Sequence, residues 1–321
     1  MVSKNAKPVY IPPKKFDFGK IISSEKDGVM NCHGVKRFQD RFMQEESNLL
    51  FGKSYGKEIG LALNPVFSQR NKNVLVLGGA GTGKTHHYIE PNLLQMNQSA
   101  VVIDFGGELY RQYGTHLADK GAKVYRISGQ ALSLSTDIDE NCIVELGSKL
   151  TYIFIQGSRF GNQKEMQAVS EFLNKLLHGL YRFAEKTVSG ETEYKSASSN
   201  QMLPFPVHFF LDEFQALNIP EFLLFFATDR KYGIGISVIV QSIEQLKLKY
   251  ENNEHEIVFA DCDTMLFFGS IMSEDTDFIR SMTNLTTDRQ KEIWANQKAI
   301  VLVRAKPPII CDKLIPEKEK L

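Results

Sequence analysis

The chain has 321 residues, of which 42% are hydrophobic and 24% are charged. This composition is typical of a globular protein with a sizeable core, and the length suits one large α/β domain or two smaller ones. Its 38 Lys and Arg residues balance its 38 Asp and Glu residues. The zero net charge gives no indication of nucleic-acid binding through bulk charge, and it leaves a local basic lining open.

The cysteines and the apolar segments indicate in which cellular compartment the protein is located. The cysteines are scattered without a Cys-x-x-Cys pair (Cys32, Cys142, Cys262 and Cys311), which predicts reduced thiols in the cytosol and argues against a zinc site. No apolar run approaches the roughly 18 residues of a membrane-spanning helix. The first residues also lack the apolar segment of a signal peptide. We therefore expect a cytoplasmic protein.

Two segments, residues 1–30 and 31–72, precede the part of the chain in which strands and helices alternate. Residues 1–30 mix lysines and prolines, for which we expect a poorly ordered basic arm. Its lysines suit phosphate contacts, although a solvated tail is the simpler explanation. Residues 31–72 are expected to pack on the core as an amphipathic helix at 34–47 and a hairpin at 49–63.

The next segment joins an apolar run to a glycine-rich turn. Residues 74–77 are apolar without alternation, as expected of a parallel strand that is buried on both faces. The turn has the Gly-x4-Gly-Lys-Thr pattern of a phosphate-binding loop. The helix that follows is expected to break early at Pro91. The candidate phosphate-binding residues are Gly78, Gly79, Ala80, Gly81, Thr82, Gly83, Lys84 and Thr85.

The chemistry of this loop predicts a nucleoside triphosphate and Mg²⁺ as ligands. Its glycines let backbone N–H groups converge on the β-phosphate, and the helix N-terminus adds about half a positive charge there. Lys84 is expected to bridge the β- and γ-phosphates, and the Thr85 hydroxyl to hold Mg²⁺. A tight turn that binds nothing is the alternative, and the strand directly before the loop argues against it.

From residue 73 onward strands and helices alternate, which is typical of a wound parallel sheet. We expect a nucleotide-binding domain over 73–315, followed by a charged tail at 316–321. Residues 128–150 fit no element clearly, and residues 188–203 are expected to form an exposed, mobile loop. The strands and helices predicted after the loop are, in order, 100–104, 108–120, 123–127, 151–155 and 163–187.

An apolar strand predicted at 207–211 ends in Asp212 and Glu213. This is the arrangement of a Walker B site, in which Asp212 holds the water shell of Mg²⁺ and Glu213 orients and deprotonates the attacking water. A strand end that meets a helix cap is the alternative for the acids alone. At least two strands separate loop and acids, which leaves room for an extra strand between theirs in the sheet. This spacing favours a RecA-like P-loop hydrolase, with a mainly parallel sheet flanked by helices, over a nucleotide kinase.

Two polar residues follow the acids. The strand predicted at 234–241 ends in Gln241, which suits a hydrogen bond to the γ-phosphate and equally suits a polar strand cap. Arg230 lies at a helix end, where it is either a cation that complements the helix dipole or an arginine finger. Four further elements complete the sequence: a strand at 264–268, a capped helix from 273, and closing strands at 299–303 and 308–311.

The order of these motifs resembles the TraG/TraD-type coupling ATPases of conjugation and type IV secretion. The resemblance runs from about residue 70 to 311. The stretches that carry it are GGAGTGKTHHYIEPNL at 78–93, VIDFGGELY at 102–110, LDEFQALNIP at 211–220, GIGISVIVQS at 233–242 and DCDTMLFFG at 261–269.

The resemblance implies an ATP hydrolase that assembles as a homo-hexamer at the inner face of the cell membrane. It implies coupling of ATP hydrolysis, with Mg²⁺ as cofactor, to recruitment and translocation of a relaxase–DNA complex or a protein substrate into the secretion channel. The implied partners are the relaxase or relaxosome, single-stranded DNA and channel proteins. The family pattern also makes Arg230 a finger that reaches the γ-phosphate of a neighbouring subunit.

The chain departs from the family pattern in three places. No N-terminal transmembrane helix is predicted, and only residues 128–150 stand where the family inserts a helical domain. Phe105 and Gly106 replace the Pro and Lys of the family's Asp-Pro-Lys-Gly-Glu motif. Two alternatives stay open: an ATP-gated docking platform that hydrolyses little, and a generic DNA translocase of the FtsK/HerA type.

Overall fold

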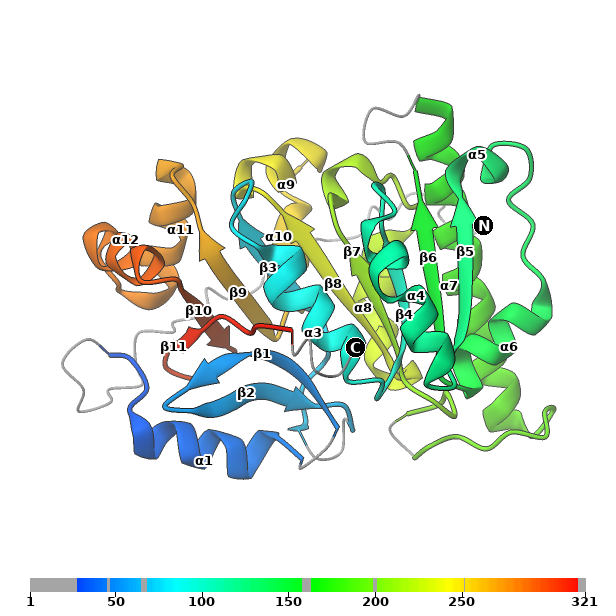
Figure 1. Cartoon of the computed structure of the whole chain (residues 1–321), viewed down its shortest axis with the longest axis horizontal. Helices are drawn as coiled ribbons and strands as arrows, with labels where there is room; N and C mark the ends of the chain where they lie inside the picture. The colour runs from blue at the N-terminus through cyan, green and yellow to red at the C-terminus, as the bar shows by residue number, and fades with distance from the viewer. Residues whose placement is uncertain are drawn as a thin grey trace, which may run out of the picture.

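The computed structural model describes residues 28–44, 47–64, 68–157, 163–198, 201–250 and 252–316. The arm and the tail expected at the two ends lie almost entirely outside these ranges. The described part forms an 11-stranded sheet with helices on both faces (Figure 1). Within it, no helix is both long enough and apolar enough to cross a bilayer.

The sheet has a parallel part and an antiparallel part, in the order β2-β1-β11-β10-β9-β3-β8-β7-β4-β6-β5. On one side of β9, the strands β9, β3, β8, β7, β4, β6 and β5 pair in parallel. On its other side, the strands β9, β10, β11, β1 and β2 pair antiparallel. The mainly parallel α/β sheet predicted from the sequence is therefore confirmed. The strands are β1 (Asn48–Ser54), β2 (Lys57–Ala62), β3 (Val74–Gly78), β4 (Ser99–Ile103), β5 (Lys123–Ser128), β6 (Thr151–Gln156), β7 (Val207–Leu211), β8 (Ile234–Val240), β9 (Thr264–Gly269), β10 (Lys298–Val303) and β11 (Ile309–Asp312).

The central strands are mostly apolar and buried along their whole length because each contributes to two cores. Leu75 and Leu77 of β3 face one core, and Val74 and Val76 face the other. The first core is covered by α7 (Gln163–Ser189) and α8 (Phe222–Thr228), and the second by α3 (Glu90–Leu94) and α4 (Glu108–Asp119) (Figure 1). Burial on both faces removes the alternation that a half-exposed strand would show.

The helix after the glycine-rich loop passes through Pro91 instead of breaking there. It opens as a π-helical turn, η2 (Thr85–Ile89), and continues as α3 with Pro91 in its first turn. The wider turn, in which Glu90 N bonds to Thr85 O, places the proline where no backbone donor is needed. The remaining helices are α1 (Cys32–Phe42), α5 (Gly129–Leu132), α6 (Glu140–Ser148), η3 (Phe214–Ala216), η4 (Asp229–Tyr232), α9 (Ile243–Lys249), α10 (His255–Asp261), α11 (Ser273–Thr283) and α12 (Thr287–Ala295).

Two other local expectations need correction. The N-cap position of α11 is Met272, which makes no side-chain hydrogen bond, because Ser273 is already the first helical residue. The exposed loop expected at 188–203 ends in buried residues: Leu203 is fully buried, and its N–H donates to Tyr232 O at 2.9 Å. The undefined residues 128–150 contain the short helices α5 and α6.

The N-terminal helix and hairpin join the main sheet. β1 pairs with β11, with Lys53 opposite Asp312, so the hairpin extends the antiparallel part of the sheet. The apolar face of α1, formed by Val35, Phe38 and Phe42, is buried in the same core as β1 and β2. The segment at 31–72 therefore shares a core with the strands that follow it.

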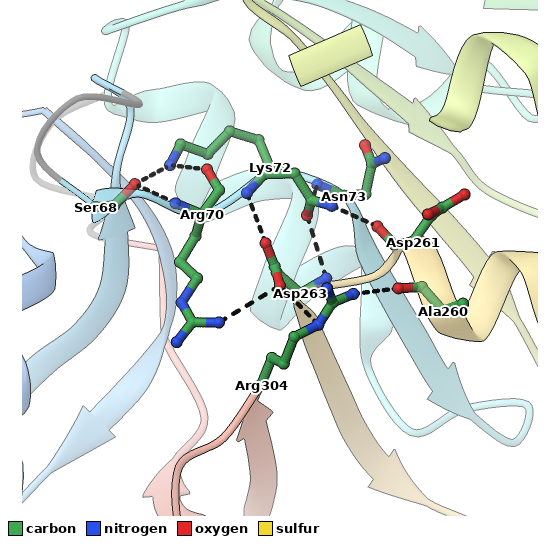
Figure 2. Close-up of polar contacts among 9 residues, drawn as sticks. Ser68, Arg70, Lys72, Asn73, Ala260, Asp261, Asp263 and Arg304 are labelled. Atoms are coloured by element: carbon green, nitrogen blue, oxygen red, sulfur yellow. Dashed lines mark hydrogen bonds and ion pairs between the residues drawn. The ribbon is translucent and has the colours of Figure 1, made fainter. Parts of the chain in front are cut away.

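A polar cluster holds the linker that leads into β3 (Figure 2). Asp263 Oδ2 accepts a hydrogen bond from Asn71 N at 2.8 Å, and Asp263 Oδ1 lies 2.9 Å from Arg304 Nε and 3.6 Å from Arg70 Nη1. Asn71 Nδ2 also donates to Asp261 O at 2.6 Å. These bonds tie the linker to residues directly before β9 and, through Asp263, to the residue after β10, and so fix where β3 enters the sheet.

Candidate functional site

The glycine-rich loop connects the carboxyl end of β3 to η2. Gly79 N donates to Gly269 O at 2.9 Å, which ties the loop to the end of β9. Gly81 and Gly83 have φ of +73° and +84°, a region that side chains with a Cβ rarely adopt. At Gly83 a Cβ would also lie 2.4 Å from the His87 ring. This position therefore requires glycine for both conformation and space.

Lys84 lies against the loop that precedes it. Its ammonium Nζ donates to Gly78 O at 2.5 Å and to Gly79 O at 3.1 Å. Burial lowers the pKa of Lys84, and the nearby carboxylates of Asp212 and Glu213 oppose that shift. The lysine is thus held at the mouth of the loop, facing two acids from another strand.

The two acids follow β7 and reach the same place. The Thr85 hydroxyl donates to Asp212 Oδ2 at 3.2 Å, and Glu213 N donates to Asp212 Oδ1 at 3.0 Å. Glu213 adopts a left-handed conformation with φ of +52°, which is uncommon for a residue with a side chain and turns the chain sharply after the strand. Lys84, Asp212 and Glu213 all line one cavity of about 440 Å³.

The strand between β3 and β7 is β8. An extra strand was expected between the strands of the loop and the acids, and the structure has one there. Which strand lies there was not predicted, because β8 comes after the acids in the chain rather than between the loop and the acids. Gln241 stands directly after β8, lines the cavity, and donates its backbone N–H to Gln245 Oε1 at 3.0 Å.

The far wall of the cavity contains residues that the sequence reasoning did not assign. Asp104, at the end of β4, accepts hydrogen bonds from Leu109 N at 3.2 Å and Tyr110 N at 2.9 Å. Burial raises the pKa of Asp104, and these bonds oppose the shift. Glu108 and Gln112 of α4 line the same wall. The position of Asp104 at the carboxyl end of a parallel strand was a usable signal, because such ends gather at one edge of a sheet.

Glu90 is a second acid that sequence reasoning missed. It is 7% exposed, accepts a hydrogen bond from the Tyr113 hydroxyl at 2.5 Å, and lies 3.0 Å from His86 Nδ1. Its place in the cavity wall follows from the helix after the loop. The His86–Glu90 pair has the i,i+4 spacing of neighbours on a helix face, which was the available signal.

Arg230 does not reach this cavity. It is an exposed residue of η4, which precedes β8, whereas the cavity lies at the carboxyl ends of β3, β8 and β7. Arg230 instead lines a small pocket at the amino ends of the strands, together with Arg70, Lys72 and His208. Within one chain, the structure separates Arg230 from the other predicted site residues.

The residues around the cavity suit a phosphate with a hard cation. The Thr85 hydroxyl and the Asp212 carboxylate are oxygen ligands of the kind that Mg²⁺ prefers, and Lys84 supplies a positive charge next to the loop amides. Among the described residues, no group of three or more His, Cys, Asp and Glu side chains is placed to hold a metal. A magnesium ion at Thr85 and Asp212 would therefore depend on phosphate oxygens and water for its other ligands.

Comparison with known proteins agrees with this geometry. Residues 31–138 match the family model described as type IV secretory system conjugative DNA transfer. Residues 206–299 match the model described as the TraM recognition site of TraD and TraG. The comparison with curated proteins found no match.

Solved structures share the fold at low sequence identity. The plasmid coupling protein TrwB, in complex with ADP and Mg²⁺, is 11% identical with a TM-score of 0.61, over 90% of this chain and 94% of that one. VirB4 of Thermoanaerobacter pseudethanolicus is 12% identical with a TM-score of 0.51, over 86% of this chain and 99% of that one. The chain therefore has a RecA-like P-loop NTPase fold and belongs to the conjugative coupling proteins of type IV secretion.

Proposed function

We propose that this protein is a motor ATPase that couples ATP hydrolysis to recruitment and translocation of a relaxase–DNA complex, or of a protein substrate, into a type IV secretion channel. The observation that carries the proposal is the convergence of Lys84, Thr85, Asp212 and Glu213 on one cavity. The glycine-rich loop, a hydroxyl, a lysine and two adjacent acids are the parts that phosphoryl transfer to water requires.

Each residue has a proposed role in this reaction. The loop 78–85 holds the phosphates of ATP through its backbone amides, and Lys84 neutralises charge between the β- and γ-phosphates. Thr85 and Asp212 hold Mg²⁺, which screens the phosphate charge when bound. Glu213 orients the attacking water and accepts its proton. Gln241, between loop and acids, hydrogen-bonds the γ-phosphate.

Arg230 has its proposed role in a neighbouring subunit. It is exposed and lies at the end of the sheet opposite its own cavity. An arginine in that position can contact a γ-phosphate only across a subunit interface, so this role requires an assembly with active sites between subunits, which we propose to be a homo-hexamer. Hydrolysis then depends on assembly.

The partners and the location follow from family membership. We propose that the relaxase or relaxosome, single-stranded DNA and channel proteins are the partners, and that the protein works at the cytoplasmic face of the cell membrane. The match to conjugative transfer models over residues 31–138 and 206–299 favours this function over that of a generic FtsK/HerA-like translocase.

Steady-state ATPase assays over a range of protein concentrations, with and without single-stranded DNA, test the proposal. We expect turnover per subunit to rise with concentration, in parallel with assembly measured by sedimentation with a slowly hydrolysed ATP analogue. Glu213→Gln is the matched control, because it keeps the side-chain shape and removes the base, and it is expected to lower kcat by about 10²–10⁴-fold. Nucleotide binding by an assembled wild-type protein that shows only background turnover would instead identify an ATP-gated docking platform.

A further inference from the structure

The segment after the last strand lies against the phosphate-binding loop. Residues 313–316, here called the C-terminal strap, follow β11 and run past β3 towards α3 (Figure 1). Lys313 Nζ donates a hydrogen bond to Thr82 O at 3.2 Å. His87 Nδ1 lies 2.6 Å from Leu314 O, and because a carbonyl only accepts, the histidine donates. The strap thus contacts both the loop and the helix that follows it.

The lysine contact determines the orientation of one peptide group in the loop. In a planar trans peptide the C=O and the following N–H point in opposite directions. A bond that holds Thr82 O towards Lys313 therefore turns the Gly83 N–H away from Lys313. Gly83 lines the nucleotide cavity, whereas neither Thr82 nor Lys313 does. The lysine consequently acts on the cavity from behind the loop.

The surroundings of Lys313 limit its freedom. Its ammonium lies 5.4 Å from the centre of the Phe268 ring, on which the His87 ring also stacks at 6.3 Å. Leu314 is 4% exposed, which anchors the strap next to the lysine. Because β11 pairs with both β10 and β1, the strap also connects the antiparallel part of the sheet to the loop.

The geometry points to Lys313 as a positioning residue for the phosphate-binding loop: its bond to the Thr82 carbonyl keeps the Gly83 N–H directed at the phosphates of the bound nucleotide. This inference rests on the proposed nucleotide binding. The Lys313 bond extends the phosphate-binding site to a residue that is far from the loop in the sequence. It also orients the loop amides before the nucleotide binds, which is the condition for their full electrostatic effect.

Nucleotide affinity separates this role from a merely structural one. The variants are Lys313→Met, which removes the donor, and Lys313→Arg, which keeps it. Lys298→Met is the matched control. Lys298 is a surface lysine of β10 that pairs with Asp312, the residue directly before Lys313. Dissociation constants for ADP and for a fluorescent ATP analogue are measured with Mg²⁺, and the melting temperature is measured with and without ADP.

We expect Lys313→Met to weaken binding of both nucleotides about tenfold, the usual effect of losing one hydrogen bond from a charged donor. Lys313→Arg should restore affinity to within about threefold, and Lys298→Met should not change it. Lys313→Met should raise KM for ATP in the same ratio while kcat changes little, because the bond is made before and during hydrolysis alike.

Wild-type affinity in Lys313→Met would overturn the inference and leave the proposed function intact, whereas a wild-type protein that fails to bind ATP would overturn the proposed function itself. If Lys313→Met lowers the melting temperature of the nucleotide-free protein, Lys313→Gln decides, since it keeps a polar side chain that is shorter and carries no charge. A Lys313→Gln protein with wild-type stability and weakened binding supports the positioning role. Equal loss of stability and affinity in all three variants at Lys313 contradicts it.

Discussion

The Thr85 hydroxyl lies 3.2 Å from Asp212 Oδ2, although the two residues are 127 positions apart in the chain. They follow β3 and β7, which are not neighbours in the sheet, because β8 runs between them. Parallel strands place their carboxyl ends along one edge, so the loop and the acids face each other across the end of β8. This contact is the proposed magnesium position.

Removing either oxygen should weaken the magnesium-dependent part of nucleotide binding. We expect Thr85→Val and Asp212→Asn each to raise the Mg²⁺ concentration needed for half-maximal ADP binding about tenfold or more, because the first removes the hydroxyl ligand and the second removes the negative charge of the carboxylate. Thr85→Ser keeps the hydroxyl and is the matched control. The measurement is a Mg²⁺ titration at fixed ADP, followed by fluorescence. If Thr85→Val and Asp212→Asn keep the Mg²⁺ midpoint of the wild type, the assignment of the two oxygens fails.

Each active site should need Arg230 from one subunit and Glu213 from the neighbouring subunit for ATP hydrolysis. Arg230→Ala is expected to lower turnover about 10³-fold, the lower end of measured arginine-finger effects. Mixing Arg230→Ala with Glu213→Gln should restore part of the activity, because some interfaces then combine an intact acid with an intact arginine. Steady-state ATPase rates of the mixtures give the readout.

The matched control for Arg230 is Lys231→Ala, which removes the adjacent exposed cation of η4. Its turnover should stay within about twofold of the wild type, as is usual for a surface substitution. Mixtures of the two inactive variants that show no more activity than either alone would rule out a finger acting between subunits.

The two positive-φ glycines of the loop should differ in their tolerance of alanine. A Cβ at Gly83 would meet the His87 ring at 2.4 Å, whereas a Cβ at Gly81 meets nothing within 4 Å. Gly81→Ala therefore adds only conformational strain of about 1 kcal/mol, and Gly83→Ala adds a steric clash to that strain. We expect Gly83→Ala to abolish ADP binding and Gly81→Ala to weaken it less than about tenfold, as measured by isothermal titration calorimetry. Equal affinities in the two variants would contradict the role of His87 as the obstacle.

Lys72 should make stability depend on pH. It is 8% exposed, its Nζ donates to Ser68 Oγ at 2.6 Å, and burial lowers its pKa from 10.5 to about 7. Between these values the unfolded chain holds a proton that the folded protein lacks. The free energy of unfolding should therefore rise as pH increases from about 7 towards 10.5, by at most about 1.4 kcal/mol per pH unit from this group. Below pH 7 the buried lysine is charged in both states and its full desolvation cost remains.

Lys72→Met removes the titrating group and keeps most of its volume. Urea unfolding of both proteins at about pH 6.5, 7.5 and 8.5 measures the difference in slope. We expect the free energy of unfolding of the variant to change less with pH than that of the wild type over this range. Parallel pH profiles for the two proteins would show that Lys72 keeps its ordinary pKa in the folded state.

Local sequence was enough to predict the strands that carry the site. β3, β7 and β8 are short, mostly apolar runs without alternation, a pattern set by burial on both faces. Each is followed directly by the loop or by a polar residue that lines the cavity. Local sequence misled at Pro91, where a π-helical turn accommodates the proline. It predicted the start of the helix at 273 correctly but not its cap, because Met272 occupies the N-cap position and makes no side-chain hydrogen bond. Both errors concern backbone geometry of one or two residues, which tertiary packing sets.

Glu90 and Lys313 could not be assigned from the chain alone. Glu90 joins the cavity because its helix packs beside α4, where Tyr113 binds it. Lys313 reaches Thr82 across 231 positions because β11 places the strap beside the loop. Nearby sequence indicates at most the His86 neighbour of Glu90, and it indicates neither Tyr113 as the partner of Glu90 nor Thr82 as the partner of Lys313.

The sequence by itself determined that the chain contains a phosphate-binding loop, a pair of acids after a buried strand, and an α/β sheet, because each of these is encoded in a few consecutive residues. Only the tertiary structure decided that β8 separates loop and acids, that the hairpin extends the same sheet through β11, and that Arg230 lies at the opposite end from its own cavity. The physical reason is that strand pairing and helix packing join residues far apart in the chain, and their geometry depends on the whole core.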